Sequence, residues 1–141
     1  MIAVDTNVLL RYILQDDPIQ SPLAASLIRG VHKVLVTDAV LVEVVWTLVG
    51  KKYQQKKADI IKVILALFAE RNVQFEDGQV VWKALNDYKK AQPVKRKYAD
   101  SADALIINKS RSVIEKLGQQ FDGSYTFDKA AQKLSGAKIP Q

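Results

Sequence analysis

The chain opens with MIAVDTNVLL (residues 1–10), a stretch that sets the pattern for the rest of the sequence. Its apolar run, Ile2–Val4, has the length of a short buried strand and stops at three polar residues, Asp5, Thr6 and Asn7. Side chains of this kind end strands and cap helices. Beyond them, apolar residues recur at helical spacing, at positions 8, 9, 12 and 13. The stretch therefore predicts a strand that leads through a polar turn into a helix.

The same alternation of short apolar runs and helical patterns continues along the chain. Further strands are predicted at 34–36, 73–75 and 125–127, and residues 138–140 either add a terminal strand or lie loose. One helix is predicted from 8 to about 15, and a second opens after Asp16-Asp17-Pro18 and stops at Gly30. Further helices are predicted over 57–70, 77–90 and 101–117, with a short one from 128. Such alternation predicts an α/β protein with a mostly parallel sheet covered on both faces.

The run AVLVEVVWTLV (residues 39–49) admits two interpretations. Its β-branched valines suit a strand, whereas its length favours a helix that Thr37 or Asp38 caps and that ends near Gly50. One carboxylate, Glu43, interrupts the run. Because a buried and unpaired carboxylate is costly, Glu43 either lies on a wet face or has a partner.

Composition narrows the class of protein. The 141 residues suit one domain over 1–141, and 48% of them are hydrophobic. The absence of cysteine excludes disulfides and thiolate metal sites. We expect no membrane segment and no signal peptide, and hence a cytoplasmic protein. The net charge of +6 favours a polyanionic partner such as nucleic acid, although an ordinary solvated surface explains it too.

Four carboxylates stand out because the predicted topology brings them to one edge of the sheet. Asp5 and Asp128 follow strands, Asp103 lies near the start of a helix, and Glu43 lies within the helix after the second strand. Converging carboxylates repel one another unless a cation is present, and Mg²⁺ or Mn²⁺ prefers oxygen ligands. Each acid also has a simpler interpretation, as a helix cap or a solvated residue; Asp103 could complete a capping box with Asp100.

Basic residues cluster in three places, and the cluster Lys95-Arg96-Lys97 directly precedes the third acid. These side chains could hold RNA phosphates near a metal, a contact that positions RNA without reading its sequence. A solvated loop is the alternative. Tyr98 is the best candidate for stacking on a base, whereas Trp46 and Trp82 fit a core or an interface better.

Four motifs, in this order, resemble the PIN-domain family: VDTNVLL, LVEVVWTL, ADALII and YTFDKAAQKL. The resemblance is closest to the VapC-type toxin ribonucleases of toxin–antitoxin systems, and it extends over nearly the whole chain. It implies a three-layer α/β/α sandwich around a central, mostly parallel sheet. It also implies a Mg²⁺- or Mn²⁺-dependent endoribonuclease that hydrolyses RNA phosphodiesters with a metal-activated water.

Site roles follow from the resemblance, position by position. Asp5 and Asp103 would be direct metal ligands, and Glu43 and Asp128 would complete the site directly or through water. Asp100, three residues before Asp103, could take part or replace it. The resemblance also implies a supporting residue near the first acid: Asn7 or Thr6 would orient Asp5 or a bound water.

The resemblance also implies partners: an RNA substrate, a cognate VapB-like antitoxin and a second copy of the chain in a homodimer. Two other functions compete with this one. A non-catalytic RNA-binding module could retain the same fold. A phosphotransfer receiver domain also gathers acids at strand ends, but it needs an acid pair directly after a strand, and Asp16-Asp17 follows a helix instead.

Overall fold

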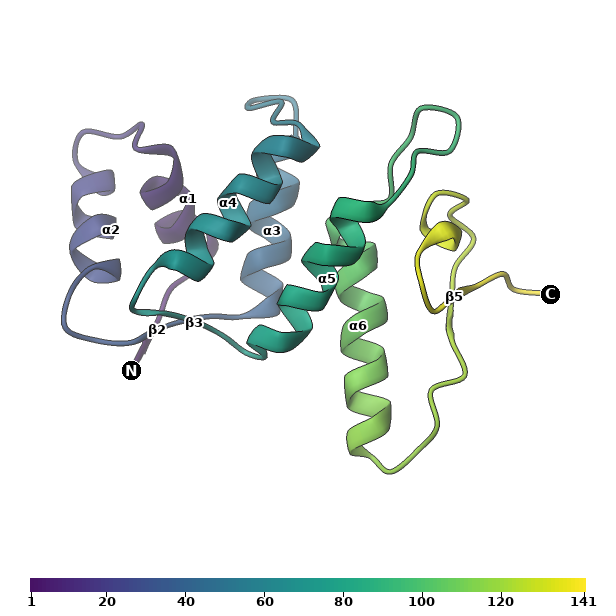
Figure 1. Ribbon diagram of the computed structural model, residues 1–141. Helices are drawn as coiled ribbons and strands as arrows, with labels where there is room; N and C mark the ends of the chain where they lie inside the picture. The colour runs from purple at the N-terminus through teal and green to yellow at the C-terminus, as the bar shows by residue number, and fades with distance from the viewer. The chain divides into compact units, whose positions relative to one another are not determined.

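The computed structural model describes residues 1–141, and the contacts within the chain divide it into two compact units (Figure 1). Unit 1 comprises Met1–Glu76 and unit 2 comprises Asp77–Gln141. None of the helices has both the length and the apolar character that a membrane span requires. The predicted single domain over 1–141 stays a prediction.

Unit 1 is built on a parallel three-stranded sheet of order β1-β2-β3, formed by Ile2–Ala3, Val34–Val36 and Val73–Phe75. Ile2 pairs with Val34, which also pairs with Val73. The side chains of Val34 and Val36 are fully buried because β2 is the central strand. The connections between parallel strands are helical, as this topology requires.

Four helices make these connections, and each begins where the sequence offers a cap or a turn. Asp5 caps the first of them through its side chain, and Thr37 caps the third in the same way. Fully buried side chains such as Leu9, Ile28 and Leu48 form the core of the unit. The helices are α1 (Thr6–Leu14), α2 (Gln20–Ile28), α3 (Asp38–Val49) and α4 (Lys57–Ala69).

The run 39–49 is helical, so the strand interpretation was wrong and the helix prediction is confirmed. Helix α3 buries Leu41, Val44, Val45 and Leu48, which recur at helical spacing on one face. Glu43 lies off that face and is exposed. The apolar run thus tolerates a carboxylate because the carboxylate stays in water.

Unit 2 is built on the pair α5 (Gly78–Lys90) and α6 (Ser101–Lys116), shown in green in Figure 1. The buried Asn108 amide of α6 donates to Asp87 Oδ2 of α5 at 2.8 Å and to the Ala104 carbonyl at 2.9 Å. A buried amide is costly unless it is bonded in this way, so the polar pair fixes the register of the two helices.

The end of the chain adds a small parallel pair, β4 (Ser124–Tyr125) with β5 (Ala137–Lys138), and a short 3₁₀ helix η1 (Ala131–Lys133) between them. The predicted strand 125–127 is thus shifted toward the N-terminus. The reason is that Thr126 already belongs to a turn, since its hydroxyl accepts from the Asp128 backbone N–H at 3.0 Å. All paired strands in both units are parallel, which confirms the predicted α/β class.

The two units meet in sequence at two acidic residues that belong to different units. Glu76 accepts from the Asp38 backbone N–H at 2.9 Å, within unit 1. Asp77 caps α5 through Val80 N–H at 3.2 Å and pairs with Lys116 at 3.2 Å, within unit 2. Both residues that flank the peptide bond between the units are therefore held by side-chain contacts within their own unit.

Candidate active site

Asp5 stands at the carboxyl end of β1 and is exposed. Its Oδ1 accepts from the Val8 backbone N–H at 3.0 Å, so it caps α1 as its type and place predict. A carboxylate has two oxygens, and this cap engages one of them. The capping role and a ligand role are therefore compatible for Asp5.

Glu43 receives a hydrogen bond from Thr6, the residue after Asp5. The Thr6 hydroxyl donates to Glu43 Oε2. This contact ties the start of α1 to α3, and it brings Glu43 to the residue that follows Asp5. Unit 1 thus places two of the five predicted acids, Asp5 and Glu43, at the same end of its fold. Asn7 or Thr6 was predicted to orient Asp5 or a bound water, and this stays a prediction. In the structure the Thr6 hydroxyl contacts Glu43, and Asn7 is exposed.

Asp100 and Asp103 form a capping box at the start of α6. Asp100 Oδ1 accepts from Ala102 N–H, and Asp103 Oδ2 accepts from Asp100 N–H, both at 3.0 Å. The simpler interpretation of Asp103 as a capping residue is therefore confirmed. It does not compete with a ligand role, since the box fixes Asp103 in one orientation through one oxygen.

Asp128 is held at both of its oxygens. Oδ1 accepts from Ala130 N–H at 2.8 Å and Ala131 N–H at 3.0 Å, and Oδ2 pairs with Lys97 Nζ at 3.2 Å. The Ala131 N–H and then Lys97 lower the pKa of Asp128 below its usual range, because each favours the ionised form. Asp128 is thus an ionised, oriented carboxylate at neutral pH.

Asp100, Asp103 and Asp128 act on one another, and we call these three residues the acidic cluster. Burial raises the pKa of Asp103, and the charges of Asp100 and Asp128 raise it further. The Asp100 N–H and the Lys97 ammonium oppose this rise. Perturbation of this kind by like charges is typical of functional sites, where a cation offsets the repulsion.

The donors of both units suit a hard divalent cation. Asp5 and Glu43 in unit 1 and the acidic cluster in unit 2 offer only carboxylate oxygens, the ligands that Mg²⁺ and Mn²⁺ prefer. As the side chains lie, no group of three or more acids, histidines or cysteines is arranged to hold a metal ion. By the chemistry of its donors, the predicted set therefore fits Mg²⁺ or Mn²⁺.

A tight hairpin carries the basic residues Lys95, Arg96 and Lys97. Val94 N–H donates to the Lys97 carbonyl at 2.8 Å, and Lys97 N–H donates to the Val94 carbonyl at 3.0 Å. The two residues at the tip have positive φ values, 49° at Lys95 and 67° at Arg96, as in a type I′ turn. Sequence reasoning treated this segment as loop, because the Lys-Arg pair lacks the Asn-Gly signature of such turns.

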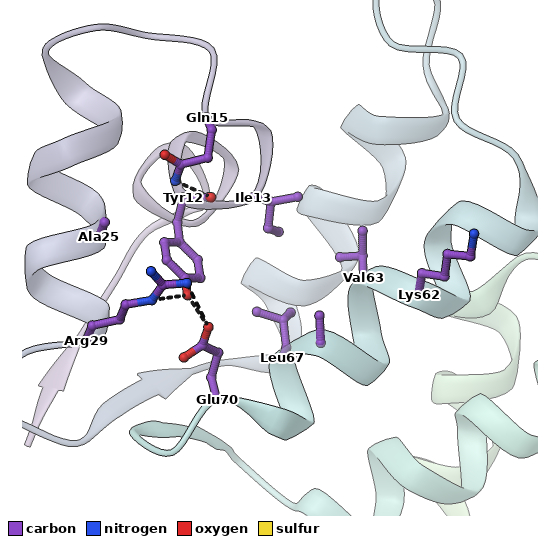
Figure 2. A pocket seen from close by; sticks show the side chains of 10 residues that line it. Tyr12, Ile13, Gln15, Ala25, Arg29, Lys62, Val63, Leu67 and Glu70 are labelled. Carbon is purple, nitrogen blue, oxygen red and sulfur yellow. Dashed lines mark hydrogen bonds and ion pairs between the residues drawn. The ribbon is translucent and has the colours of Figure 1, made fainter.

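Unit 1 also has a hollow between α1, α2 and α4, whose lining residues are drawn in Figure 2. Its volume is about 560 Å³. Tyr12 lies at its centre: its hydroxyl donates to Glu70 Oε1 and accepts from Arg29 Nε at 3.0 Å. The Arg29 guanidinium also lies 5.3 Å from the centre of the Tyr12 ring. Sequence reasoning missed this cluster because its members are far apart in the chain. None of the predicted acids lines this hollow.

Arg11, Trp46 and Trp82 do not line this hollow. Arg11 pairs with Asp16 at 2.6 Å and donates to the Tyr53 hydroxyl at 3.3 Å, so it is an internal ion-pair partner. Trp46 and Trp82 are exposed, so the suggestion that they belong to the core was wrong. Exposed aromatic side chains keep an interface role open for both.

Comparison with known proteins complements this geometry. No curated protein matches the chain. The family model for the PIN domain matches residues 2–116, which include four of the five predicted acids and end before Asp128. This match and the parallel pairing of the strands confirm the predicted PIN-like α/β fold. Since the match spans most of the sequence, the chain belongs to the PIN-domain family.

Proposed function

We propose that the protein is a metal-dependent endoribonuclease and the toxin of a type II toxin–antitoxin pair. PIN domains are typically Mg²⁺- or Mn²⁺-dependent nucleases, and membership of that family is the observation that carries the proposal. The oriented carboxylates support it, because Asp5, Asp103 and Asp128 are each fixed by backbone N–H groups. Catalytic groups need such fixed positions before the substrate arrives.

The proposal assigns a role to each acid. Asp5 and Asp103 would hold the metal directly, and Glu43 and Asp128 would complete the site directly or through water. Asp100 is the secondary candidate, because the resemblance assigns the third acid to Asp103, three residues further on. When bound, the metal would supply a Lewis acid and a more acidic water for phosphodiester hydrolysis.

Thr6 in unit 1 and Lys97 in unit 2 each contact one of these acids. The Thr6 hydroxyl fixes one oxygen of Glu43, and the Lys97 ammonium fixes one oxygen of Asp128. At the tip of the hairpin, the exposed Lys95 and Arg96 would contact RNA phosphates. Because phosphate contacts carry no sequence information, the preferred RNA would be selected by its shape and by other contacts.

The test of the nuclease is cleavage of a mixed RNA pool by the purified chain. Cleavage is expected with Mg²⁺ or Mn²⁺ and is expected to stop with EDTA. Asp5→Asn should reduce the rate at least about a hundredfold, because it removes a charged ligand while the cap oxygen remains. The matched control is Asp122→Asn, which neutralises an exposed acid outside the candidate site and should cleave normally.

The competing function is a non-catalytic RNA-binding module. It predicts RNA binding that is unchanged by EDTA and no cleavage by any preparation of the wild-type chain. If Asp5→Asn binds RNA as tightly as the wild type while neither cleaves, the binding module is the better description. If only the wild type cleaves, the nuclease stands.

The toxin role adds two partners, a VapB-like antitoxin and a second copy of the chain. What supports a protein partner is the number of large apolar side chains that α2 leaves exposed, with Leu23 at 63% and Leu27 at 46%. A small gene directly upstream should encode the antitoxin, and its product should co-purify with this chain and suppress cleavage. Light scattering on the isolated chain should give the mass of a dimer, twice 15.8 kDa.

A further inference from the structure

Lys97 brings a positive charge into the acidic cluster of unit 2. Its Nζ lies 3.2 Å from Asp128 Oδ2, and its charge also opposes the raised pKa of Asp103. One ammonium therefore acts on two of the three carboxylates. The side chain is 73% exposed, so burial does not hold it there.

The backbone determines where this ammonium lies. Lys97 is the last residue of the hairpin and is tied to Val94 by two backbone hydrogen bonds. The two residues before it, Lys95 and Arg96, both take left-handed backbone conformations that non-glycine residues rarely adopt. Strain of this kind persists where the surrounding structure and the function demand it.

We propose that Lys97 is a positioning residue that serves as the resident counter-ion of the acidic cluster. It competes with the divalent cation for Asp128 Oδ2, and once displaced it binds an RNA phosphate. This inference rests on the proposed function, because it takes the acidic cluster to be part of the metal site.

The physical reason is charge. An ammonium and a divalent cation that share one carboxylate oxygen repel each other, so binding of the metal weakens the ion pair with Lys97. The released ammonium stays on a hydrogen-bonded hairpin beside Lys95 and Arg96. Three cations on one short turn then face the polyanion, and a phosphate oxygen replaces Asp128 as the partner of Lys97.

The first readout is Mn²⁺ affinity of the full chain, measured by calorimetry and by electron paramagnetic resonance of free Mn²⁺. Lys97→Gln is expected to bind Mn²⁺ about fivefold more tightly than the wild type, the size expected for loss of an exposed ion pair. Lys95→Gln is the matched control, since it removes one charge from the same hairpin without touching Asp128. Its Mn²⁺ affinity should change less than about twofold.

The second readout is RNA affinity, measured by anisotropy on a phosphorothioate RNA that resists cleavage. Without metal, Lys97→Gln should bind RNA as the wild type does, because Lys97 is occupied by Asp128. With Mn²⁺, the same variant should bind RNA severalfold more weakly than the wild type. Lys97→Arg keeps the charge and should restore both wild-type affinities.

The possible outcomes separate this inference from the proposed function. If wild-type chain binds Mn²⁺ and Lys97→Gln binds it equally or less tightly, Lys97 is not a competing counter-ion and the inference fails alone. If Lys97→Arg behaves like Lys97→Gln, charge is not the cause and the inference also fails. If the wild-type chain binds no Mn²⁺, both the proposed function and the inference about Lys97 fail.

Discussion

Thr6 shows how one side chain can set the environment of a proposed ligand. Its hydroxyl fixes Glu43 Oε2, and its neighbour Asp5 is fixed by the backbone of α1. Two acids from different helices are thus placed through adjacent residues. A motif read as DTN carries this arrangement, although only its first residue was predicted as a ligand.

Thr6→Val tests this role because it keeps the shape of the side chain and removes its hydroxyl. We expect RNA cleavage to fall about tenfold, since Glu43 loses the group that orients it. Thr47→Val is the control, because the Thr47 hydroxyl donates only to the backbone carbonyl of Glu43, at 2.8 Å. Equal activities for the two variants would show that orientation of Glu43 does not matter.

Asp103 and Asp128 should affect stability in opposite directions with pH. The pKa of Asp103 is raised, so its favourable contribution is present below its ordinary value of 3.8 and is lost as pH rises through the folded value. Ionised Asp103 therefore destabilises the fold at pH 7. Asp103→Asn, which keeps a cap oxygen, should unfold at higher urea concentration at pH 7, by a few tenths of a kcal/mol after solvent screening.

The pKa of Asp128 is lowered, so its stabilising effect is present above 3.8 and is lost as pH falls through the folded value. Asp128→Asn should therefore lower the urea midpoint at pH 7 and matter less in acid. Urea titrations of both variants at pH 7 and at about pH 2.5, below the ordinary carboxyl pKa, test the pair. A shift in the same direction for both at pH 7 would contradict these assignments.

Helix α3 shows that burial pattern, rather than residue type, decided its structure. Its valines suit a strand, but Leu41, Val44 and Leu48 share one helical face against the core of unit 1. Leu48→Ala should cost about 2–5 kcal/mol, because Leu48 is fully buried and truncation leaves a cavity. Val49→Ala, at an exposed neighbour, should cost well under about 1 kcal/mol in the same urea titration.

The basic hairpin should respond to substitution in a way that separates its fold from its function. Lys95→Asn with Arg96→Gly gives the residues that a type I′ turn prefers, and it should raise stability by about 1 kcal/mol. RNA affinity should fall at the same time, because two phosphate contacts are lost. Lys89→Gln with Lys90→Gln removes the same charge from the end of α5 and should leave RNA affinity closer to that of the wild type.

Elements with local signals could be predicted from the sequence, and elements decided by distant contacts could not. Asp5, Asp77 and Asp100 are residues of the type that begins helices, and each is the N-cap of a helix in the structure. The hairpin was missed because its turn lacks glycine and asparagine. The ion pair of Lys97 with Asp128 joins residues 31 apart in sequence, and no periodicity connects them.

The whole chain is predicted to unfold as one domain, and it contains a natural probe for each unit. Trp46 belongs to unit 1 and Trp82 to unit 2. Trp82→Phe leaves fluorescence from unit 1, and Trp46→Phe leaves fluorescence from unit 2. We expect the same urea midpoint from both variants, after correction for any shift that circular dichroism reports, because a single domain unfolds cooperatively. Separate midpoints would show that the units unfold independently.

The short joint at Glu76 and Asp77 has a consequence for proteolysis. Glu76 is hydrogen-bonded within unit 1, and Asp77 is hydrogen-bonded and ion-paired within unit 2. Proteases cut most readily where the chain is exposed and unconstrained. Limited proteolysis of the full chain should therefore spare this joint, even though it connects two compact units.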